Sequence, residues 1–520
     1  MTGRMNTFIK EKKFGLLSLI FIIICVVSFM ATASETIQIP DQESLKKILT
    51  DFEEYAEQAL KDWGIPGMAI AIVQGDQLIY AQGFGVKKLG GSDPVDESTI
   101  FQIGSTSKAF TVSLVSMMVD EGKLNWKDKV VDHLPDFRMY DPWVTREFTI
   151  EDAMAQHSGM PGYAGDFQAF IGFDRSHIIH SLRYIQPISS FRSGFAYMNN
   201  LFLVAAALVE KCTEQSWEEN LQKRILDPLG MTSTTFTRVG FVNSSNVAFL
   251  HQKLNGQVSV IPMDWQFFDW VYIYGPAGGI NSNVIDLAKW LRLQLNDGVF
   301  DNKQLISKEN IELMHSPHTI INSSQLNGNN YYDLAWVTTD YHPYPLVWHN
   351  GGTSGIKALI QLDPQAKLGI VVLTNFASTP LPEDLGKRFV DLYLGNPLRD
   401  WSREDLDAVK KADEAAAEVV SPVSPEKPLS LDEYTGSYQN SVYGDVTITR
   451  ENEKLVLTMG PKKVKTYLLP WNRDTFMLSI PDYQIQASMV VFHLDQNGKV
   501  IRMVIDSLND GNLGTFEREK

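Results

Sequence analysis

Cysteine is almost absent from this chain. Only Cys25 and Cys212 occur among its 520 residues, and they form no Cys-x-x-Cys pair. A disulfide scaffold needs several paired cysteines, and structural zinc sites usually need closely spaced cysteines or histidines. The sequence also lacks His-Glu-x-x-His, the helical zinc signature of many metalloproteases. These absences exclude a disulfide framework and the common zinc signatures.

Positive charge is also in short supply. The chain has 46 Lys and Arg residues against 62 Asp and Glu residues, a formal net charge of −16. A nucleic-acid-binding surface needs concentrated Lys and Arg, so nucleic acid is excluded as a partner. The apolar content of 44% is sufficient for substantial cores, which excludes wholesale disorder. A length of 520 residues exceeds the usual size of one core and predicts two or three folded units.

The N-terminus has the layout of an export signal over residues 1–33. A basic start that ends at Lys13 precedes an uncharged apolar run over residues 14–30, and Ala31-Thr32-Ala33 follows. This small-x-small pattern predicts cleavage after Ala33 and a periplasmic or secreted protein. The apolar run also has about the length of a membrane span, so an uncleaved membrane tether through residues 14–30 is the alternative.

The rest of the chain divides by composition into two folded units and a linker. Residues 40–397 have the mixed pattern of a large α/β unit, and residues 429–520 contain short strands with turn residues between them, typical of a small all-β barrel. Between them, residues 398–428 contain a charged, alanine-rich run and then three prolines at three-residue spacing. This composition predicts a semi-rigid linker.

Two segments of the large unit have clear patterns. Residues 106–122 are apolar around most of a helical circumference, which predicts a buried helix with Gly122 at its C-terminal cap. Residues 357–362 and 368–375 flank Asp363-Pro364-Gln365-Ala366, which predicts a β-hairpin with a four-residue connection.

The main chemical signal is Ser105-Thr106-Ser107-Lys108, directly before the predicted helix. This spacing places a serine and a lysine one turn apart on the same helix face. A serine hydroxyl becomes a good nucleophile when a neighbouring group accepts its proton, and burial lowers the pKa of a lysine enough for that task. The signal alone is weak, because Ser44-Leu45-Lys46-Lys47 has the same spacing in a polar stretch. The apolar helix behind Ser105 distinguishes the two.

Two further motifs follow along the chain. In Tyr197-Met198-Asn199 the tyrosine can act as a general base and the amide can bind a substrate amide, although a core tyrosine beside a capping asparagine is the structural alternative. His349-Asn350-Gly351-Gly352 is predicted between two strands, where glycine lets a substrate backbone approach a strand edge. His157-Ser158-Gly159 has a similar pattern and is interpreted as a loop that supports the site.

The order Ser-x-x-Lys, Tyr-x-Asn, His-x-Gly resembles the β-lactamase-related serine hydrolases, a family of class C β-lactamases, D-alanyl-D-alanine carboxypeptidases, D-aminopeptidases and esterases. The resemblance covers roughly residues 45–395 and extends to Ile65-Pro66-Gly67-Met68-Ala69 and Pro276-Ala277-Gly278-Gly279-Ile280. It implies an α/β (α+β) fold of the serine β-lactamase/DD-peptidase type, with an antiparallel sheet flanked by helices and an all-α region. Residues 429–520 resemble the lipocalin-like modules that are appended to such hydrolases.

The resemblance also implies roles for individual residues. Ser105 attacks a carbonyl and becomes an acyl-enzyme, while Lys108 and Tyr197 share the proton transfers, with the choice of base left open. Asn199, His349 and Gly351 bind substrate, and the backbone N–H groups of Ser105 and Gly352 form the oxyanion hole. No metal or organic cofactor is implied, and the oligomeric state is left open.

One departure from the family pattern bears on substrate choice. Penicillin-recognising members usually have Lys-Thr-Gly in the third motif, whereas this chain has His349, Asn350 and Gly351. A histidine of ordinary pKa is mostly neutral at pH 7 and attracts a substrate carboxylate less than lysine does. The sequence therefore predicts a hydrolase of esters, amides or D-amino-acid-containing peptides, with weak or absent β-lactam hydrolysis.

Other functions remain as alternatives. One is a true β-lactamase or penicillin-binding carboxypeptidase, and another, of a different class, is a non-catalytic binding protein on the same fold. An α/β-hydrolase is disfavoured because the sequence has no Gly-x-Ser-x-Gly elbow. The substrate is expected to be a small molecule that enters a pocket lined by the region from about 160 to 275. The aromatic candidates there, for which a core position is the competing interpretation, are Trp265, Phe267, Phe268 and Trp270.

Overall fold

The computed structural model describes residues 40–254, 256–324, 328–415, 422–479 and 488–520. The predicted export signal over residues 1–33, and with it the alternative membrane tether, lies outside the described residues. Among the helices within the described ranges, none is both long and apolar enough to span a bilayer.

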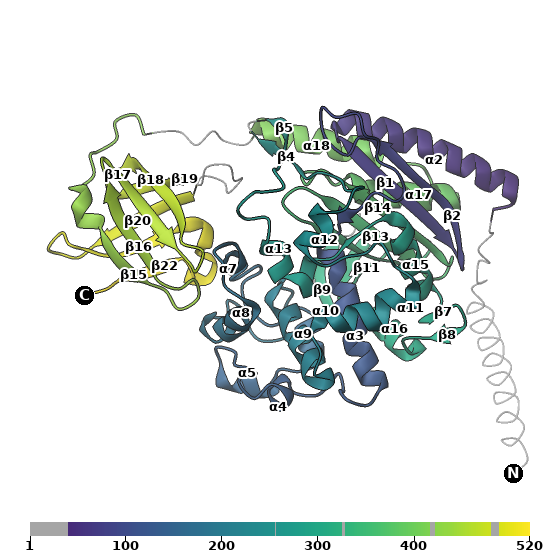
Figure 1. Ribbon diagram of the computed structural model, residues 1–520, viewed down its shortest axis with the longest axis horizontal. Coiled ribbons are helices and arrows are strands. Elements are labelled where there is room, and N and C mark those ends of the chain that lie inside the picture. The colour runs from purple at the N-terminus through teal and green to yellow at the C-terminus, as the bar shows by residue number, and fades with distance from the viewer. Residues whose placement is uncertain (1–39, 255, 325–327, 416–421, 480–487) are drawn as a thin grey trace, which may run out of the picture. The chain divides into compact units, whose positions relative to one another are not determined.

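The predicted antiparallel sheet is present and has eight strands (Figure 1). Every neighbouring pair in it runs antiparallel. In spatial order the strands are β2 (Gln77–Gly85), β1 (Gly67–Gln74), β14 (Leu368–Thr374), β13 (Lys357–Asp363), β12 (Leu346–Gly352), β11 (Val337–Thr339), β10 (Gly328–Tyr332) and β9 (Thr319–Ser324). The predicted hairpin is confirmed, because β13 and β14 pair from Lys357 with Thr374 to Asp363 with Leu368.

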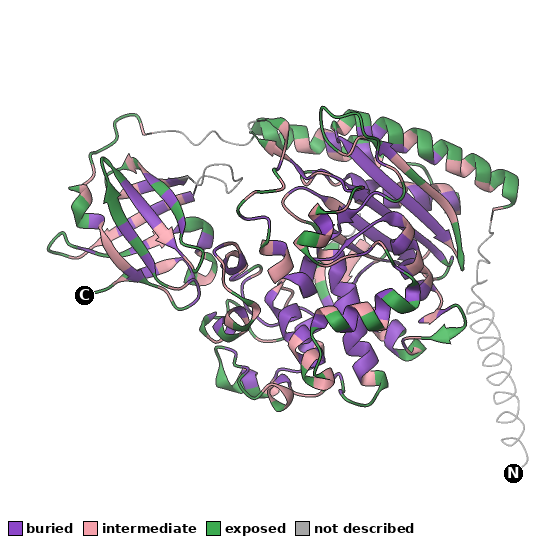
Figure 2. Ribbon diagram, viewed as in Figure 1, coloured by how far each residue is buried: buried purple, intermediate pink, exposed green. Residues whose placement is uncertain are grey.

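Helices cover both faces of this sheet, which explains why its central strands are apolar throughout. Helix α17 (Leu381–Leu394) lies against one face, where Gly386 approaches Leu359 and Gln361 of β13. Helix α15 (Val284–Leu295) lies against the other face, where Leu291 and Leu295 approach Gly369 of β14. Strands β1, β13 and β14 are accordingly almost fully buried (Figure 2). A strand buried on both faces is expected to be a continuous apolar run rather than an alternating one.

The predicted buried helix is α3 (Ser107–Asp120), and every residue from Ser107 to Met118 is buried. It starts one residue later and ends two residues earlier than predicted, and Gly122 has the expected left-handed backbone with a φ of +67°. Phe110 stacks on Trp290 of α15 with ring centroids 3.9 Å apart, which connects the helical region to the sheet. Helix α9 (Asn200–Thr213) packs against α3 and is also largely buried.

The remaining helices and three short strand pairs complete this unit. The helices are α2 (Gln42–Trp63), α4 (Val130–His133), α5 (Pro142–Glu147), α6 (Ile150–Met154), α7 (Phe167–Phe170), α8 (Arg175–Ser181), α10 (Trp217–Leu221), α11 (Asp227–Leu229), α12 (Arg238–Val242), α13 (Trp270–Ile273), α14 (Gly275–Gly278) and α16 (Lys308–Met314). The short strands pair as β3 (Phe101–Gln102) with β6 (Asn281–Ser282), β4 (His251–Leu254) with β5 (Gln257–Val260), and β7 (Val299–Phe300) with β8 (Lys303–Gln304).

The region predicted as a linker contains a helix in its first half. Residues Trp401–Ala415 form α18, which packs on α17. The indole of Trp401 donates a hydrogen bond to Asp391 of α17 at 2.8 Å, and Leu406 is buried. Residues 401–415 contain no Gly or Pro, so their composition fits a docked helix as well as a linker.

The C-terminal unit is an all-β barrel, as predicted, and its eight strands form a closed sheet. Each strand pairs with the next along the chain, and β15 pairs with β22 to close the barrel. Its core includes four aromatic rings, those of Tyr434, Tyr438, Phe476 and Phe492. The strands are β15 (Gly436–Gln439), β16 (Val446–Glu451), β17 (Lys454–Met459), β18 (Val464–Asn472), β19 (Thr475–Ser479), β20 (Ser488–Leu494), β21 (Val500–Ile505) and β22 (Thr515–Arg518).

Candidate active site

The predicted nucleophile, Ser105, lies in a single 3₁₀ turn between strand β3 and helix α3. The turn is η1 (Gly104–Thr106). Gly104 has a φ of +54°, in the left-handed region that favours glycine, and a Cβ added there would lie 2.5 Å from the backbone nitrogen of Gly352. The turn therefore presents Ser105 at the start of a buried helix and close to the end of strand β12.

Lys108 is buried, and the three hydrogens of its ammonium group are matched by three acceptors. Its Nζ donates to Ser105 Oγ at 3.1 Å, to Asn199 Oδ1 at 2.7 Å and to the carbonyl oxygen of Ala277 at 2.7 Å. Burial lowers the pKa of Lys108 to about 7, and the charge of Asp166 opposes this decrease. A substantial fraction of Lys108 is therefore neutral near pH 7 and able to accept a proton.

Tyr197 completes a cluster with Ser105 and Lys108. Its side chain is hydrogen-bonded to Ser105, and Lys108 Nζ lies 4.7 Å from the centre of its ring. Burial raises the pKa of Tyr197 well above its ordinary value, and the hydrogen bond with Ser105 opposes the increase. The phenol is consequently protonated near pH 7, so it is placed to donate a proton rather than to accept one.

The amide of Asn199 is held at both ends. Its Oδ1 accepts from Lys108, and its Nδ2 donates to Asp166 Oδ2 at 2.5 Å. Because an ammonium group can only donate, the oxygen of the amide must face Lys108 and the nitrogen must face the carboxylate. An amide nitrogen carries two hydrogens, so one N–H remains in addition to the one given to Asp166.

Sequence reasoning missed Asp166. This residue precedes α7 and is 33 positions from Asn199 in the sequence. Burial raises the pKa of Asp166 to about 7, while the hydrogen bond from Asn199 and the charge of Lys108 oppose the increase. Its Oδ1 is buried and has no hydrogen-bond partner among the described residues. No spacing rule connects an acid in this loop to a Tyr-x-Asn motif, so the sequence contained no signal for the pairing.

His349 lies inside strand β12 (Leu346–Gly352), whereas its motif was predicted between two strands. The imidazole is buried, with Nδ1 2.5 Å from the carbonyl oxygen of Asn350 and Nε2 3.3 Å from the hydroxyl of Tyr332. Burial first, and the charge of Lys108 second, lower the pKa of His349 to about 3. His349 is therefore neutral over the whole physiological pH range.

Gly351 and Gly352 end strand β12 next to the serine turn. A Cβ added to Gly351 would lie 2.0 Å from the carbonyl oxygen of Ile103 and 3.1 Å from the backbone nitrogen of Ser105. Only glycine allows the strand to come this close. The backbones of Ser105 and Gly352 are thereby brought together, as an oxyanion hole built from their N–H groups requires.

Most of these residues, though not Lys108 or Gly351, line a cavity of about 520 Å³. Trp270 lies in its wall, whereas the predicted aromatics Phe267 and Phe268 are buried in the core and Trp265 packs against it. Lys357 is a cavity residue that the sequence analysis did not select, and its ammonium group is 2.9 Å from Glu383. The lining comprises Ser105, Tyr163, Asp166, Phe170, Phe195, Tyr197, Asn199, Trp270, Val271, Tyr274, Ala277, Gly278, Ile321, Tyr332, Val337, Trp348, His349, Asn350, Gly352 and Lys357.

The loop that contains His157 supports the site from outside the cavity. The backbone carbonyl oxygen of Gln156 accepts a hydrogen bond from the backbone nitrogen of Ala196 at 2.8 Å. The side-chain oxygen of Gln156 accepts another from the backbone nitrogen of Met198. His157 bonds to Asp152 at 2.7 Å instead of facing Ser105. The structure thus places this loop where it positions the Tyr197 segment.

The described part of the chain contains no group of three or more His, Cys, Asp or Glu side chains arranged to hold a metal ion. The structure brings Ser105, Lys108, Tyr197 and Asn199 into direct contact and places His349, Gly351 and Gly352 around them. The catalytic roles of these residues remain predictions.

Comparison with known proteins matches both folded units. A family model described as Beta-lactamase matches residues 52–394, and one described as "Domain of unknown function (DUF3471)" matches residues 421–517. Two curated relatives come from Aspergillus. "Unguisins hydrolase ungD'" of Aspergillus campestris is 29% identical and covers 86% of this chain and 87% of its own length. "Unguisins hydrolase ungD" of Aspergillus violaceofuscus is 30% identical and covers 78% of this chain and 77% of its own length.

A solved structure has the same fold. The octameric penicillin-binding protein homologue from Pyrococcus abyssi superposes with a TM-score of 0.60 at 20% sequence identity, and the match covers 88% of this chain and 98% of that one.

Proposed function

The chain belongs to the Beta-lactamase family and is a serine hydrolase, and from this premise we propose that it is an exported enzyme that hydrolyses esters, amides or D-amino-acid-containing peptides through an acyl-enzyme on Ser105. The observation that carries the proposal is the 3.1 Å hydrogen bond between Ser105 Oγ and the Nζ of buried Lys108, whose pKa is lowered to about 7. A neutral lysine at this distance can take the serine proton at physiological pH.

In the first half-reaction, neutral Lys108 accepts the proton of Ser105 as the serine oxygen attacks the substrate carbonyl. The developing oxyanion is stabilised by the backbone N–H groups of Ser105 and Gly352. Tyr197, with its raised pKa, then passes its proton to the leaving group and regains one from the Lys108 ammonium. This assignment makes Lys108 the base and Tyr197 the proton donor.

In the second half-reaction, water attacks the acyl-enzyme and restores Ser105, with the same groups transferring protons in the reverse direction. Asn199 binds the amide on the acyl side of the substrate through its remaining N–H. No metal or organic cofactor takes part in these steps.

Weak or absent β-lactam hydrolysis is part of the proposal. The third motif supplies a neutral His349, whose pKa is lowered to about 3, in place of a cation for the substrate carboxylate. The nearest cavity cation outside the catalytic cluster, Lys357, is engaged by Glu383 at 2.9 Å. A carboxylate-bearing β-lactam would have to compete with Glu383 for this charge.

The test is hydrolysis of a small panel by residues 34–520 and by the Ser105→Ala variant. The panel contains p-nitrophenyl acetate and butyrate, nitrocefin and D-alanine p-nitroanilide. We expect turnover of an ester or of the anilide, lowered roughly 10³-fold or more in Ser105→Ala. Rapid nitrocefin hydrolysis would instead establish a true β-lactamase.

A non-catalytic binding protein is the outcome if neither protein turns over the panel and mass spectrometry detects no acyl adduct on Ser105. The export part of the proposal has a separate test. N-terminal sequencing of the mature protein is expected to give Ser34 as the first residue, and an intact N-terminus in the membrane fraction would show a tether instead.

A further inference from the structure

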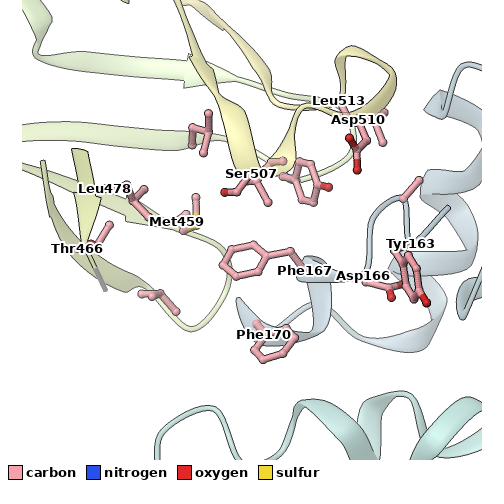
Figure 3. A pocket seen from close by; sticks show the side chains of 15 residues that line it. Tyr163, Asp166, Phe167, Phe170, Met459, Thr466, Leu478, Ser507, Asp510 and Leu513 are labelled. Carbon is pink, nitrogen blue, oxygen red and sulfur yellow. The ribbon is translucent and has the colours of Figure 1, made fainter. Parts of the chain in front are cut away.

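A second cavity, of about 280 Å³, adjoins the Ser105 cavity and is lined in part by the C-terminal barrel. We call it the barrel cavity. Figure 3 shows Phe167 extending from α7 toward Met459 of the barrel. The residues that line it are Tyr163, Ala164, Asp166, Phe167, Phe170, Tyr443, Met459, Val464, Thr466, Leu478, Ile505, Ser507, Leu508, Asp510 and Leu513.

The walls of the barrel cavity are held together by direct contacts between the two folded units. The backbone nitrogen of Lys462 donates to the carbonyl oxygen of Ile171 at 3.1 Å. At the same turn, a Cβ added to Gly460 would lie 2.3 Å from that carbonyl oxygen. The barrel turn therefore packs directly on the segment that follows α7, so the cavity has walls from both units.

The barrel cavity and the Ser105 cavity share three wall residues, Tyr163, Asp166 and Phe170. Asp166 is the partner of Asn199 at 2.5 Å, and Asn199 lines the Ser105 cavity. Under the proposed function Asn199 binds the acyl-side amide of the substrate. An acyl-side group that extends past Asn199 and Asp166 would therefore enter the barrel cavity.

The chemistry of the lining selects against anionic groups. Most of the fifteen side chains are apolar, and the charged ones are Asp166 and Asp510. No Lys, Arg or His contributes to the lining, so a carboxylate or phosphate would find no counter-ion there. An uncharged apolar group fits this environment.

The size of the cavity sets the size of that group. A cavity of about 150 Å³ lined by apolar side chains is large enough to bind benzene. The barrel cavity, at about 280 Å³, has roughly twice that room. It suits a medium-length alkyl chain or a large apolar side chain better than an acetyl group.

We propose that the barrel cavity is the acyl-side subsite of the enzyme and that it selects substrates whose acyl part carries an uncharged apolar group. The inference rests on the proposed function, because it takes Ser105 as the acylated residue and Asn199 as the acyl-side contact. It assigns the C-terminal barrel a direct part in substrate selection.

The test compares p-nitrophenyl acetate and octanoate on the full mature chain. Transfer free energies predict up to about fourfold in kcat/KM for each methylene that is buried. We expect wild-type protein to have a higher kcat/KM for octanoate than for acetate. Met459→Trp fills the cavity from β17 and should lower the octanoate-to-acetate ratio of kcat/KM by roughly tenfold or more. Leu478→Phe, a smaller change on β19, is expected to lower the ratio in the same direction if Met459→Trp does not fold.

The matched control is Ile501→Trp, which adds the same side chain at an exposed barrel position outside the cavity lining. It should leave the octanoate-to-acetate ratio at the wild-type value. A ratio unaffected by Met459→Trp and Leu478→Phe would overturn the proposal, as would a wild-type enzyme with no preference for octanoate.

A binding measurement separates this inference from the proposed function. Octanamide and acetamide are titrated into Ser105→Ala by calorimetry, with and without Met459→Trp. The subsite is supported if octanamide binds more tightly than acetamide and Met459→Trp weakens the binding of octanamide. This result would support the subsite even if no ester is hydrolysed. Equal binding of the two amides would overturn the subsite while leaving Ser105 hydrolysis intact.

Discussion

Asn199 donates a hydrogen bond from Nδ2 to Asp166 Oδ2 at 2.5 Å, while its Oδ1 accepts one from Lys108 at 2.7 Å. A buried carboxyl group is thus connected through a single amide to the ammonium group beside Ser105. The pKa of Lys108 and that of Asp166 are both about 7, the first lowered and the second raised by burial, and each charge opposes the shift of the other. The protonation states of the two groups are therefore coupled.

Replacement of Asp166 by Asn should move the pH dependence of catalysis to lower pH. Removal of the negative charge takes away an interaction that raises the pKa of Lys108, so neutral Lys108 becomes populated at a more acidic pH. The rising limb of kcat/KM against pH reports this pKa in the free enzyme. We expect its midpoint to decrease by roughly one unit, in addition to a lower maximal rate.

Asp384→Asn provides the control for that shift. Asp384 is a buried carboxyl group on α17, outside the lining of the Ser105 cavity, and burial raises its pKa to about 8. This variant should keep the wild-type midpoint. A midpoint that Asp166→Asn leaves unchanged would assign Asp166 a purely structural role.

The sequence predicted the local elements of the site better than its long-range contacts. The buried helix α3 and the β13–β14 hairpin follow from short-range periodicity and turn chemistry, and the motif order led to the family before any contact was known. The Asp166–Asn199 contact and the barrel cavity join segments far apart in the chain, and no local pattern encodes them. The His349 motif was predicted between two strands, but His349 is buried inside β12, which pairs with β11 and β13.

The region predicted as a linker illustrates another limit. The composition of residues 401–415 is compatible with a semi-rigid linker and with a docked helix, and tertiary contacts decide between them. Trp63 donates a hydrogen bond to Ser402 at 2.9 Å, from a position more than three hundred residues earlier in the chain. Such a contact cannot be read from the composition of the segment itself.

Replacement of Lys108 by Arg tests whether proton acceptance or positive charge matters. A guanidinium group remains protonated at all relevant pH values, so the variant keeps the charge but cannot accept the serine proton. We expect hydrolysis of p-nitrophenyl acetate to decrease roughly 10²- to 10⁴-fold, with the Lys108→Met variant falling in the same range. An arginine variant that retained most of the activity would show that Lys108 acts through its charge.

His349 should make the protein less stable in mild acid. Burial lowers its pKa from 6.5 to about 3, so unfolding takes up a proton below about pH 6.5. The stabilisation of the neutral buried form is complete above that pH and is lost as the pH falls toward 3. Urea titrations at about pH 7.5 and about pH 5 measure the free energy of unfolding of the wild type and of His349→Gln. On going to the lower pH, the wild type should lose about 2 kcal/mol more than the variant does. Identical pH dependence in the two proteins would contradict a depressed pKa for His349.

The two adjacent glycines at the end of β12 should respond very differently to alanine. A Cβ on Gly351 would lie 2.0 Å from the carbonyl oxygen of Ile103, whereas one on Gly352 would find its nearest atom, the carbonyl oxygen of Ile356, at 4.0 Å. Gly351→Ala must therefore push β12 away from the Ser105 turn, which should lower the free energy of unfolding by about 1–3 kcal/mol. The same movement separates the backbone N–H groups of Ser105 and Gly352, so acylation of Ser105 should become slower. Gly352→Ala should change the free energy of unfolding by no more than about 0.5 kcal/mol. Urea denaturation of both variants and acylation kinetics of Gly351→Ala measure these effects, and equal stability of the two variants would show that the strand does not approach the serine turn this closely.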